Sequence, residues 1–150
     1  MTKLVTALAG VTRIGFDTPP FIYFVEQNPK YLAVAREVFR QVDIGAILGF
    51  TGMISLAEVL VKPKSVGNKG LETAYQDVLL HSRNLTIVSI DAAVAERAAE
   101  LRSRYKIKLP DALQVASALE NGCDVFLSND STDLRRITEI TMLFLDGLEL

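Results

Sequence analysis

Four acidic residues occupy positions where a carboxylate could take part in chemistry. Asp17 follows an apolar run that ends at Phe16, and Asp130 follows another that ends near Leu127. In open parallel sheets, ligands bind beyond the carboxyl ends of the strands, so both positions are candidates for a site. Aspartate is also a common helix cap, and neither residue is decisive alone.

Glu58 and Asp111 each carry a charge into an apolar helical pattern. The surrounding segments are Ile54 to Val61 and Leu109 to Leu113. A carboxylate that faces a core without a partner is costly and favours its protonated form. The alternatives are a solvated helix face for Glu58 and, for Asp111, a helix N-terminus whose dipole favours an anion.

A bound cation would explain four converging carboxylates, because each pair repels by about 4 kcal/mol at an effective dielectric of about 20. An oxygen-only donor set suits Mg²⁺ or Mn²⁺ better than zinc. The chain has one histidine, His81, and one cysteine, Cys123. These give little basis for a Ser-His-Asp or Cys-His hydrolase, or for a Cys-rich zinc site.

The composition indicates a single domain over residues 1–150 with one core. A net charge of −2 argues against binding of nucleic acid by bulk electrostatics, so any such contact must be local. The apolar setting of Cys123 predicts a buried thiol in a reducing compartment. No window has the apolar length of a membrane span, and we expect a cytoplasmic protein without membrane contact.

Apolar runs and amphipathic segments alternate along the chain. The runs are mostly continuous, as in strands covered on both faces, and predict strands near Val11 to Phe16, Ile44 to Thr51, Leu85 to Ile90, Val125 to Leu127 and Thr141 to Leu145. Helices are predicted from Pro19 until Asn28 and over Tyr31 to Val42, Ser55 to Val61, Leu71 to His81, Ala92 to Tyr105 and Pro110 to Asn121. This order predicts an α/β fold, a three-layer α/β/α sandwich with a central, mostly parallel sheet of about five strands.

Four segments, in order, resemble the acidic motifs of the PIN-domain ribonucleases, including the VapC-type toxins of bacterial toxin–antitoxin pairs. They are Phe16-Asp17-Thr18, Ser55-Leu56-Ala57-Glu58-Val59, Leu109-Pro110-Asp111-Ala112-Leu113 with the residues to Ala118, and Leu127-Ser128-Asn129-Asp130 with the residues to Leu134. The resemblance implies a catalytic metal site for Mg²⁺ or Mn²⁺ formed by Asp17, Glu58, Asp111 and Asp130. It also implies an auxiliary role for Asp133, Thr18 and Ser128.

The implied activity is metal-dependent endoribonuclease cleavage of RNA, as in a toxin-type PIN-domain nuclease. The family usually has Asn or Ser two residues after the first aspartate, and Pro19 stands there in this chain. A catalytically impaired PIN-like module that binds RNA or protein is therefore the alternative. Pro19 also argues against a haloacid-dehalogenase-type phosphatase, which needs a second aspartate at that position.

Basic residues before and after the motifs are candidates for contacts with single-stranded or structured RNA. They are Lys62 and Lys64 together with Lys69, and Arg104, Lys106 and Lys108 together with Arg102. Charge runs of this kind are also common on solvated surfaces. The resemblance further implies a small antitoxin protein and a homodimer as partners. An aromatic stretch that includes Phe21 and Tyr23 could form an interface or belong to the core.

Overall fold

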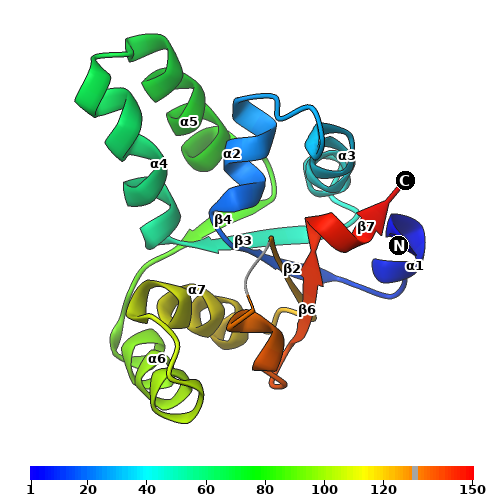
Figure 1. Ribbon diagram of the computed structural model, residues 1–150, viewed down its shortest axis with the longest axis vertical. Helices are drawn as coiled ribbons and strands as arrows, with labels where there is room; N and C mark the ends of the chain where they lie inside the picture. The colour runs from blue at the N-terminus through cyan, green and yellow to red at the C-terminus, as the bar shows by residue number, and fades with distance from the viewer. Residues whose placement is uncertain (130–131) are drawn as a thin grey trace.

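The computed structural model describes residues 1–129 and 132–150, and a five-stranded parallel sheet lies at its centre (Figure 1). The strand order is β4-β3-β2-β5-β6. The strands are β2 (Arg13–Phe16), β3 (Leu48–Gly52), β4 (Leu85–Val88), β5 (Val125–Ser128) and β6 (Thr141–Phe144). The predicted α/β class and parallel central sheet are confirmed.

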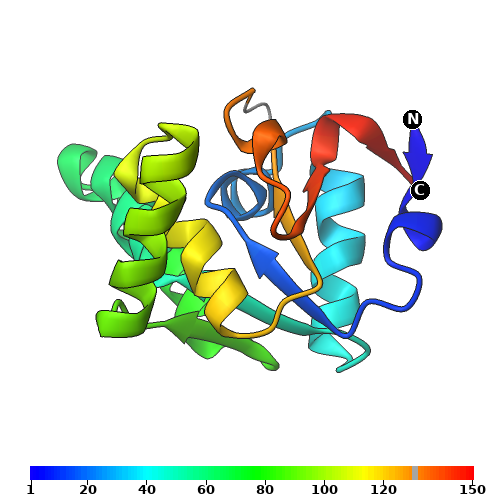
Figure 2. The same cartoon turned by 90° about the horizontal axis from the view of Figure 1, so that it is seen from below.

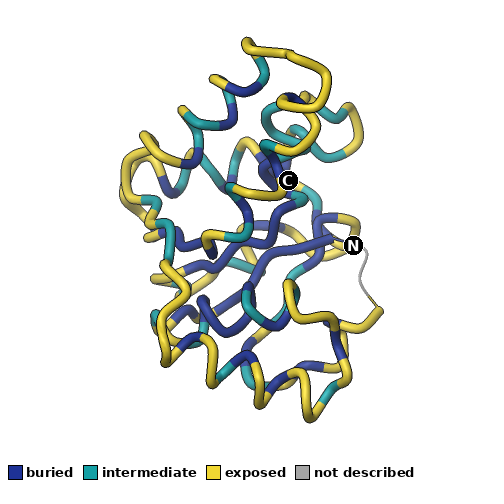
Figure 3. The backbone as a smooth tube through the Cα atoms, turned by 90° about the vertical axis from the view of Figure 1, so that its left-hand side faces the viewer, coloured by how far each residue is buried: buried dark blue, intermediate teal, exposed yellow. Residues whose placement is uncertain are grey.

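Helices cover both faces of this sheet (Figures 1 and 2). One face carries α2 (Pro19–Val25), α3 (Leu32–Asp43), α4 (Met53–Val66) and α5 (Lys69–His81). The other face carries α6 (Ala92–Tyr105) and α7 (Leu109–Glu120). The molecule thus has the three predicted layers, and Figure 3 shows the most deeply buried backbone running through its middle.

The central strands β2 and β5 divide their side chains between two hydrophobic cores. Ile14 and Phe16 belong to the core under α2, α3 and α5, whereas Phe126 belongs to the core under α6 and α7. This division follows from the alternation of side chains along a strand. Between Ile14 and Phe16, a Cβ on Gly15 would lie 2.5 Å from Cβ of Ala118, so glycine lets α7 approach the sheet.

Two predicted boundaries are wrong. We expected the helix after the second strand to end at Lys62-Pro63, but α4 continues to Val66 with Pro63 buried inside it. Its end is at Gly67, which adopts a left-handed conformation with φ 69° that glycine tolerates without a steric penalty. The second strand begins only at Leu48, because the chain from Ile44 turns through Gly45 at φ 79°.

The two ends of the chain meet in a small parallel sheet that we did not predict. It pairs β1 (Thr2–Lys3) with β7 (Leu148–Glu149). The short helix α1 (Leu4–Ala7) follows β1, and the 3₁₀ helices η1 (Leu134–Arg136) and η2 (Leu145–Gly147) lie on either side of β6. Figure 2 shows the two termini side by side.

Three further observations concern Cys123, His81 and the length of the helices. Cys123 is buried as expected, and burial raises the pKa of its thiol to about 12. His81 is exposed at the end of α5. Within residues 1–129 and 132–150, no helix is long and apolar enough to cross a membrane.

Candidate active site

The first acidic motif lies at the carboxyl edge of the central sheet. Phe16, the last residue of β2, pairs with Thr51 of β3 on one side and with Leu127 of β5 on the other. Asp17 therefore follows β2 at the level where β3 and β5 also end, and its backbone N–H donates to the Leu127 carbonyl oxygen over 2.9 Å. This is the edge at which open parallel sheets bind ligands.

Asp17 is a buried carboxylate with two hydrogen-bond donors. Ser128 Oγ donates to Asp17 Oδ2 over 2.6 Å, and the Thr18 backbone N–H donates to Asp17 Oδ1 over 2.9 Å. Burial nevertheless raises the pKa of Asp17, and the charge of Glu58 raises it further, against the lowering effect of the two hydrogen bonds. An additional positive charge would stabilise Asp17 in its ionised form.

Glu58 reaches the same region from α4. Its Oε1 accepts a hydrogen bond from Thr18 Oγ1 over 2.7 Å, so the residue after Asp17 holds this second carboxylate. Glu58 is exposed, whereas Asp17 is 8% exposed. Glu58 thus lies at the solvent side of the site. Its hydrogen bond to Thr18 distinguishes it from a carboxylate on a freely solvated helix face.

Asp111 comes from the first turn of α7 and is half-buried. Desolvation raises its pKa, and the charges of Asp17 and Asp133 add to that effect, whereas Lys108 lowers it. The pKa of Asp111 is therefore raised by the negative charges of both Asp17 and Asp133. Asp133 also pairs with Arg136 at 3.5 Å.

Asp130, the fourth predicted metal ligand, lies outside the described residues. Within the described ranges, no three acidic, histidine or cysteine side chains are close enough to form a metal site. Asp17, Glu58 and Asp111 also have no ion pair with a basic side chain in that part of the chain. The raised pKa values of Asp17 and Asp111, together with oxygen-only donors, nevertheless fit a hard divalent cation.

A buried polar cluster beside these carboxylates was missed in the sequence. Gln114 and Ser55 are 2% and 0% exposed, and Gln114 Nε2 donates to Ser55 Oγ over 2.7 Å. Gln114 lies one helical turn after Asp111, and its polar side chain interrupts the apolar run from Ala112 to Ala118. A polar residue in such a run was the available signal.

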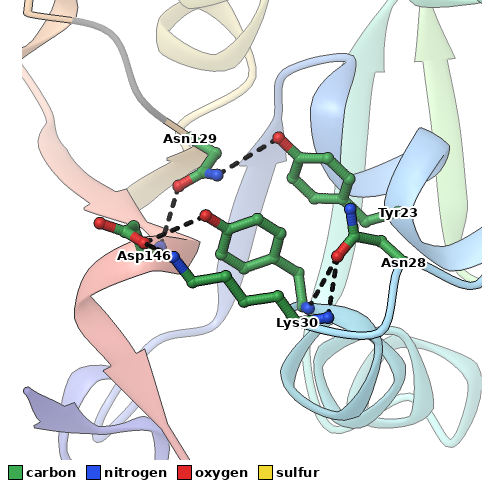
Figure 4. Close-up of polar contacts among 6 residues, drawn as sticks. Tyr23, Asn28, Lys30, Asn129 and Asp146 are labelled. Atoms are coloured by element: carbon green, nitrogen blue, oxygen red, sulfur yellow. Dashed lines mark hydrogen bonds and ion pairs between the residues drawn. The ribbon is translucent and has the colours of Figure 1, made fainter.

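A second polar network holds the end of β5 (Figure 4). Asn129 Nδ2 donates to Tyr23 Oη over 3.3 Å, and Asn129 Oδ1 accepts from the Asp146 N–H over 2.9 Å. Asp146 also accepts from Tyr31 Oη over 3.0 Å and pairs with Lys30 at 2.9 Å. The residue that follows Ser128 is therefore held between α2 and η2.

The aromatic stretch near the first motif mainly contributes to packing. Phe21 is fully buried, and its ring lies 5.5 Å from that of Phe16. Tyr23 and Tyr31 stack at 4.7 Å and are half-buried against the same core. Phe24 is also half-buried, and its ring lies 5.0 Å from that of Phe39.

Several of the basic candidates already have acidic partners. Lys62 pairs with Glu26 at 3.5 Å, and Lys64 pairs with Glu72 at 2.6 Å. Arg104 pairs with Glu139 at 3.3 Å. Lys106 and Lys108 are exposed between α6 and α7, and Lys108 lies near enough to Asp111 to lower its pKa. Of these basic candidates, Lys108 is thus the residue whose charge acts on Asp111.

The parallel sheet, its two helical layers and the acidic edge define the class of the protein. The family model of the PIN domain matches residues 14–140, and the chain belongs to the PIN domain family. The match includes Asp17, Glu58 and Asp111 and excludes the small sheet of the two termini.

Solved structures with this fold include components of toxin–antitoxin complexes. A toxin–antitoxin complex from Klebsiella pneumoniae matches at 22% identity and a TM-score of 0.67, over 89% of this chain and 98% of that chain. VapBC2 from Rickettsia felis, bound to a DNA fragment from its promoter, matches at 17% identity and a TM-score of 0.69, with the same coverage.

A third similar structure is VapC20 from Mycobacterium tuberculosis, which is described as a Sarcin-Ricin loop cleaving toxin. It matches at 15% identity and a TM-score of 0.66, over 87% of this chain and 99% of that chain. A comparison with curated proteins found no match. The structural likenesses establish the fold that this chain shares with these toxins.

Proposed function

We propose that this protein is a metal-dependent endoribonuclease of the toxin type. The observation that carries the proposal is the pair of aspartates at the carboxyl edge of the sheet, Asp17 and Asp111. Each has a raised pKa in which burial is the largest cause and a neighbouring carboxylate contributes. Membership of the PIN domain family and the fold of the toxin structures support the same activity.

In this proposal, Asp17, Glu58, Asp111 and Asp130 hold Mg²⁺ or Mn²⁺, with Asp133 as an auxiliary acid. A divalent ion held there would lower the pKa of a bound water and would stabilise charge on phosphate oxygens. Ser128 fixes the orientation of the Asp17 carboxylate through its hydrogen bond, and Thr18 does the same for Glu58. Burial of Asp17 keeps bulk water away from one side of the site.

We propose RNA as the substrate, bound through phosphate contacts near the site. Lys108 and Lys106 are the best placed of the basic candidates, because both are exposed just before Asp111. Lys62, Lys64 and Arg104 could contribute only by exchanging their present acidic partners for phosphates. Charge reversal at Lys108 should weaken RNA binding and reduce its salt dependence.

A small antitoxin is the proposed protein partner, and the toxin–antitoxin complexes among the similar structures support it. A cavity of about 270 Å³ lies between α2, α3 and α5, and Phe24 and Phe39 are among the side chains that line it. Arg36, Arg40 and Arg83 line the same cavity.

We also propose a homodimer and a cytoplasmic location.

The first test is calorimetric titration of the metal-free protein with Mn²⁺ at neutral pH, followed by cleavage assays. The wild type should bind Mn²⁺ and cleave an RNA oligonucleotide in preference to the matching DNA. Asp111→Asn should lower metal affinity and activity by more than the roughly 10- to 100-fold lost with a residue that only orients a ligand, since it removes the charge of a proposed ligand. The exposed Glu96 on α6 provides a matched control, and Glu96→Gln should leave both unchanged.

The same experiment decides against the proposal if the wild type neither binds Mn²⁺ nor cleaves RNA. RNA binding without metal would then favour the catalytically impaired module. Pro19 is the first residue of α2 and leaves no polar side chain two residues after Asp17. In that case, the titration with Mn²⁺ should be repeated on Pro19→Asn, which restores a polar side chain at this position.

A further inference from the structure

A chain of buried hydrogen bonds connects the three elements that carry Asp17, Glu58 and Asp111. It starts at Gln114 on α7, passes through Thr18 after β2, and ends on Glu58 of α4. Ser55 and Thr51 form a branch at the β3–α4 junction. Gln114, Thr18, Ser55 and Thr51 are between 0% and 5% exposed, so their polar groups depend on one another for partners.

The orientation of the Gln114 amide follows from one backbone contact. The Gly52 N–H lies 3.1 Å from Gln114 Oε1, and a backbone N–H can only donate. The oxygen of the amide must therefore face Gly52, and Nε2 must face the hydroxyls. Nε2 then donates its two hydrogens to Ser55 Oγ over 2.7 Å and to Thr18 Oγ1 over 3.2 Å.

Each hydroxyl group in this series of hydrogen bonds has a single proton, so the donor and the acceptor of each remaining hydrogen bond can be assigned. Thr51 Oγ1 donates to the Phe16 carbonyl oxygen over 2.9 Å, and it must therefore accept from Ser55 over 2.7 Å. Ser55 has then used its proton on Thr51. Thr18 accepts from Gln114, and its hydroxyl oxygen also lies 3.3 Å from Ser55 Oγ. Its one proton is donated over the shorter contact of 2.7 Å to Glu58 Oε1, because a carboxylate oxygen is an acceptor.

We infer that Gln114 is a positioning residue for the acidic site and acts on Glu58 through the Thr18 hydroxyl. By donating to Thr18, Gln114 occupies the oxygen as an acceptor and directs its proton toward the Glu58 carboxylate. By accepting from Gly52, it also ties α7, one turn after Asp111, to the start of α4. This inference rests on the proposed ribonuclease function.

Close packing at Gly52 is a second feature of the contact with Gln114. A Cβ on Gly52 would lie 2.4 Å from Gln114 Oε1 and 3.1 Å from Ser117 Oγ. Gly52 has φ −73°, which any residue can adopt, so the glycine is needed for this approach and not for backbone conformation. Gly52→Ala should thus displace the Gln114 side chain while Gln114 itself is retained.

The test compares the steady-state cleavage of RNA by Gln114→Met, Thr18→Val and the double variant, each assayed below its melting temperature. Gln114→Met keeps the length of the side chain and removes its donors. We expect kcat to fall by about 10- to 100-fold with little change in KM, as for other residues that orient a ligand. Thr18→Val should produce a similar loss.

The double variant distinguishes action through Thr18 from independent effects. If Gln114 acts on Glu58 through Thr18, the double variant should lose no more kcat than the more damaging single variant. Ser117→Ala is the matched control, because Ser117 is as buried as Gln114, lies on the same helix and donates only within it, to Leu113. Its kcat should remain that of the wild type.

The hydrogen bond between the Gly52 N–H and Gln114 can be tested directly, without metal or RNA. Hydrogen exchange of the Gly52 amide, followed by NMR, should be slow in the wild type and faster in Gln114→Met, because the acceptor is removed. If Gln114→Met does not fold, Gly52→Ala provides the second route and should reproduce the loss of kcat.

Three results would overturn the inference while the ribonuclease function stands: wild-type kcat in folded Gln114→Met, multiplicative losses in the double variant, or unchanged exchange at Gly52. An inactive wild type would instead overturn the proposed function, and the role of Gln114 with it.

Discussion

At the level of single residues, Asp17 and Asp111 lower the stability of the metal-free fold. Both carboxylates have raised pKa values because burial disfavours their ionised forms. The folded chain therefore holds these protons more tightly than the unfolded chain. Its stability should fall as the pH rises from the ordinary value of 3.8 through the raised pKa of each folded-state group.

Asp111→Asn should therefore raise the melting temperature of the metal-free protein at pH 7. The gain should shrink as the pH falls and vanish near pH 3, where Asp111 is protonated in both states. Thermal unfolding in the presence of EDTA at several pH values measures this difference. Glu96→Gln on the exposed face of α6 serves as the control, and an equal gain in that variant would contradict the prediction.

Thr18 illustrates how one residue can serve two parts of the site. Its backbone N–H donates to Asp17, and its hydroxyl donates to Glu58. The sequence already marked Thr18 and Ser128 as polar neighbours of the acidic residues, and the structure places both in direct contact with a carboxylate. From the sequence we did not predict a role for Gln114, although its polar side chain interrupts an apolar helical run, because only the fold shows that this side chain is buried.

At the level of elements, a carboxylate also organises the opposite end of the sheet. Asp124, just before β5, accepts at Oδ2 from the backbone N–H groups of Thr12 and Arg13 over 2.9 and 3.0 Å. These hydrogen bonds join the beginnings of β5 and β2, which pair in register from Ile14 and Val125 onward. They also lower the pKa of Asp124.

Asp124→Ala should lower the free energy of unfolding by about 1 kcal/mol at neutral pH, since water can partly replace this exposed acceptor. The melting temperature should fall by roughly 2–4 °C. The contribution of Asp124 is complete above the ordinary pKa of 3.8 and is lost as the pH falls through the lowered folded-state pKa. Wild type and variant should therefore converge in acid.

Asp43→Ala provides the comparison for that measurement. Asp43 is also exposed, but it only pairs with the exposed Arg83 side chain at 3.2 Å. Such surface pairs contribute little, so the change should be smaller than for Asp124→Ala. Equal effects in the two variants would show that the backbone hydrogen bonds do not join the strands as inferred.

The order and type of the main elements followed from patterns within the sequence. Five continuous apolar runs predicted the five strands because strands covered on both faces need apolar side chains on both. The helix from Ala92 to Tyr105 was predicted and is present, and the Asp91 side chain caps its N-terminus. The end of α4 was not predicted, because tertiary contacts around buried Pro63 outweigh its local tendency to end a helix.

For the whole molecule, the two termini pack together outside residues 14–140, which match the PIN domain family model. Leu4 is 4% exposed and belongs to the same core as Leu145 and Leu148. Lys3 Nζ donates to the Leu150 carbonyl oxygen over 2.8 Å. Segments more than 140 residues apart are thus packed together.

Leu4→Ala should lower the free energy of unfolding by about 2–3 kcal/mol through the cavity that it leaves in this core. The melting temperature should fall by roughly 4–12 °C. Thermal unfolding checks this, with Val5→Ala as control, because Val5 is 78% exposed. Equal melting temperatures for Leu4→Ala and wild type would show that the terminal segment does not stabilise the fold.

By itself, the sequence determined the fold class, the approximate elements and the residue types of the acidic motifs. Those features depend on local hydrophobic periodicity and on the cost of placing a charge in an apolar run, and the order of residues along the chain shows both. The resemblance to PIN-domain ribonucleases then connected the four motifs. The expected position of Asp130 remains a prediction, since that residue lies outside the described ranges.

Only the tertiary structure decided which side chains meet. Gln114 and Thr18 are 96 residues apart, and the hydrogen bond between them depends on how α7 packs against the end of β2. The pairing of β1 with β7 likewise depends on both ends of the chain folding onto one core. Hydrogen-bond directions and pKa shifts arise from such distant contacts, because burial and partners are properties of the folded chain.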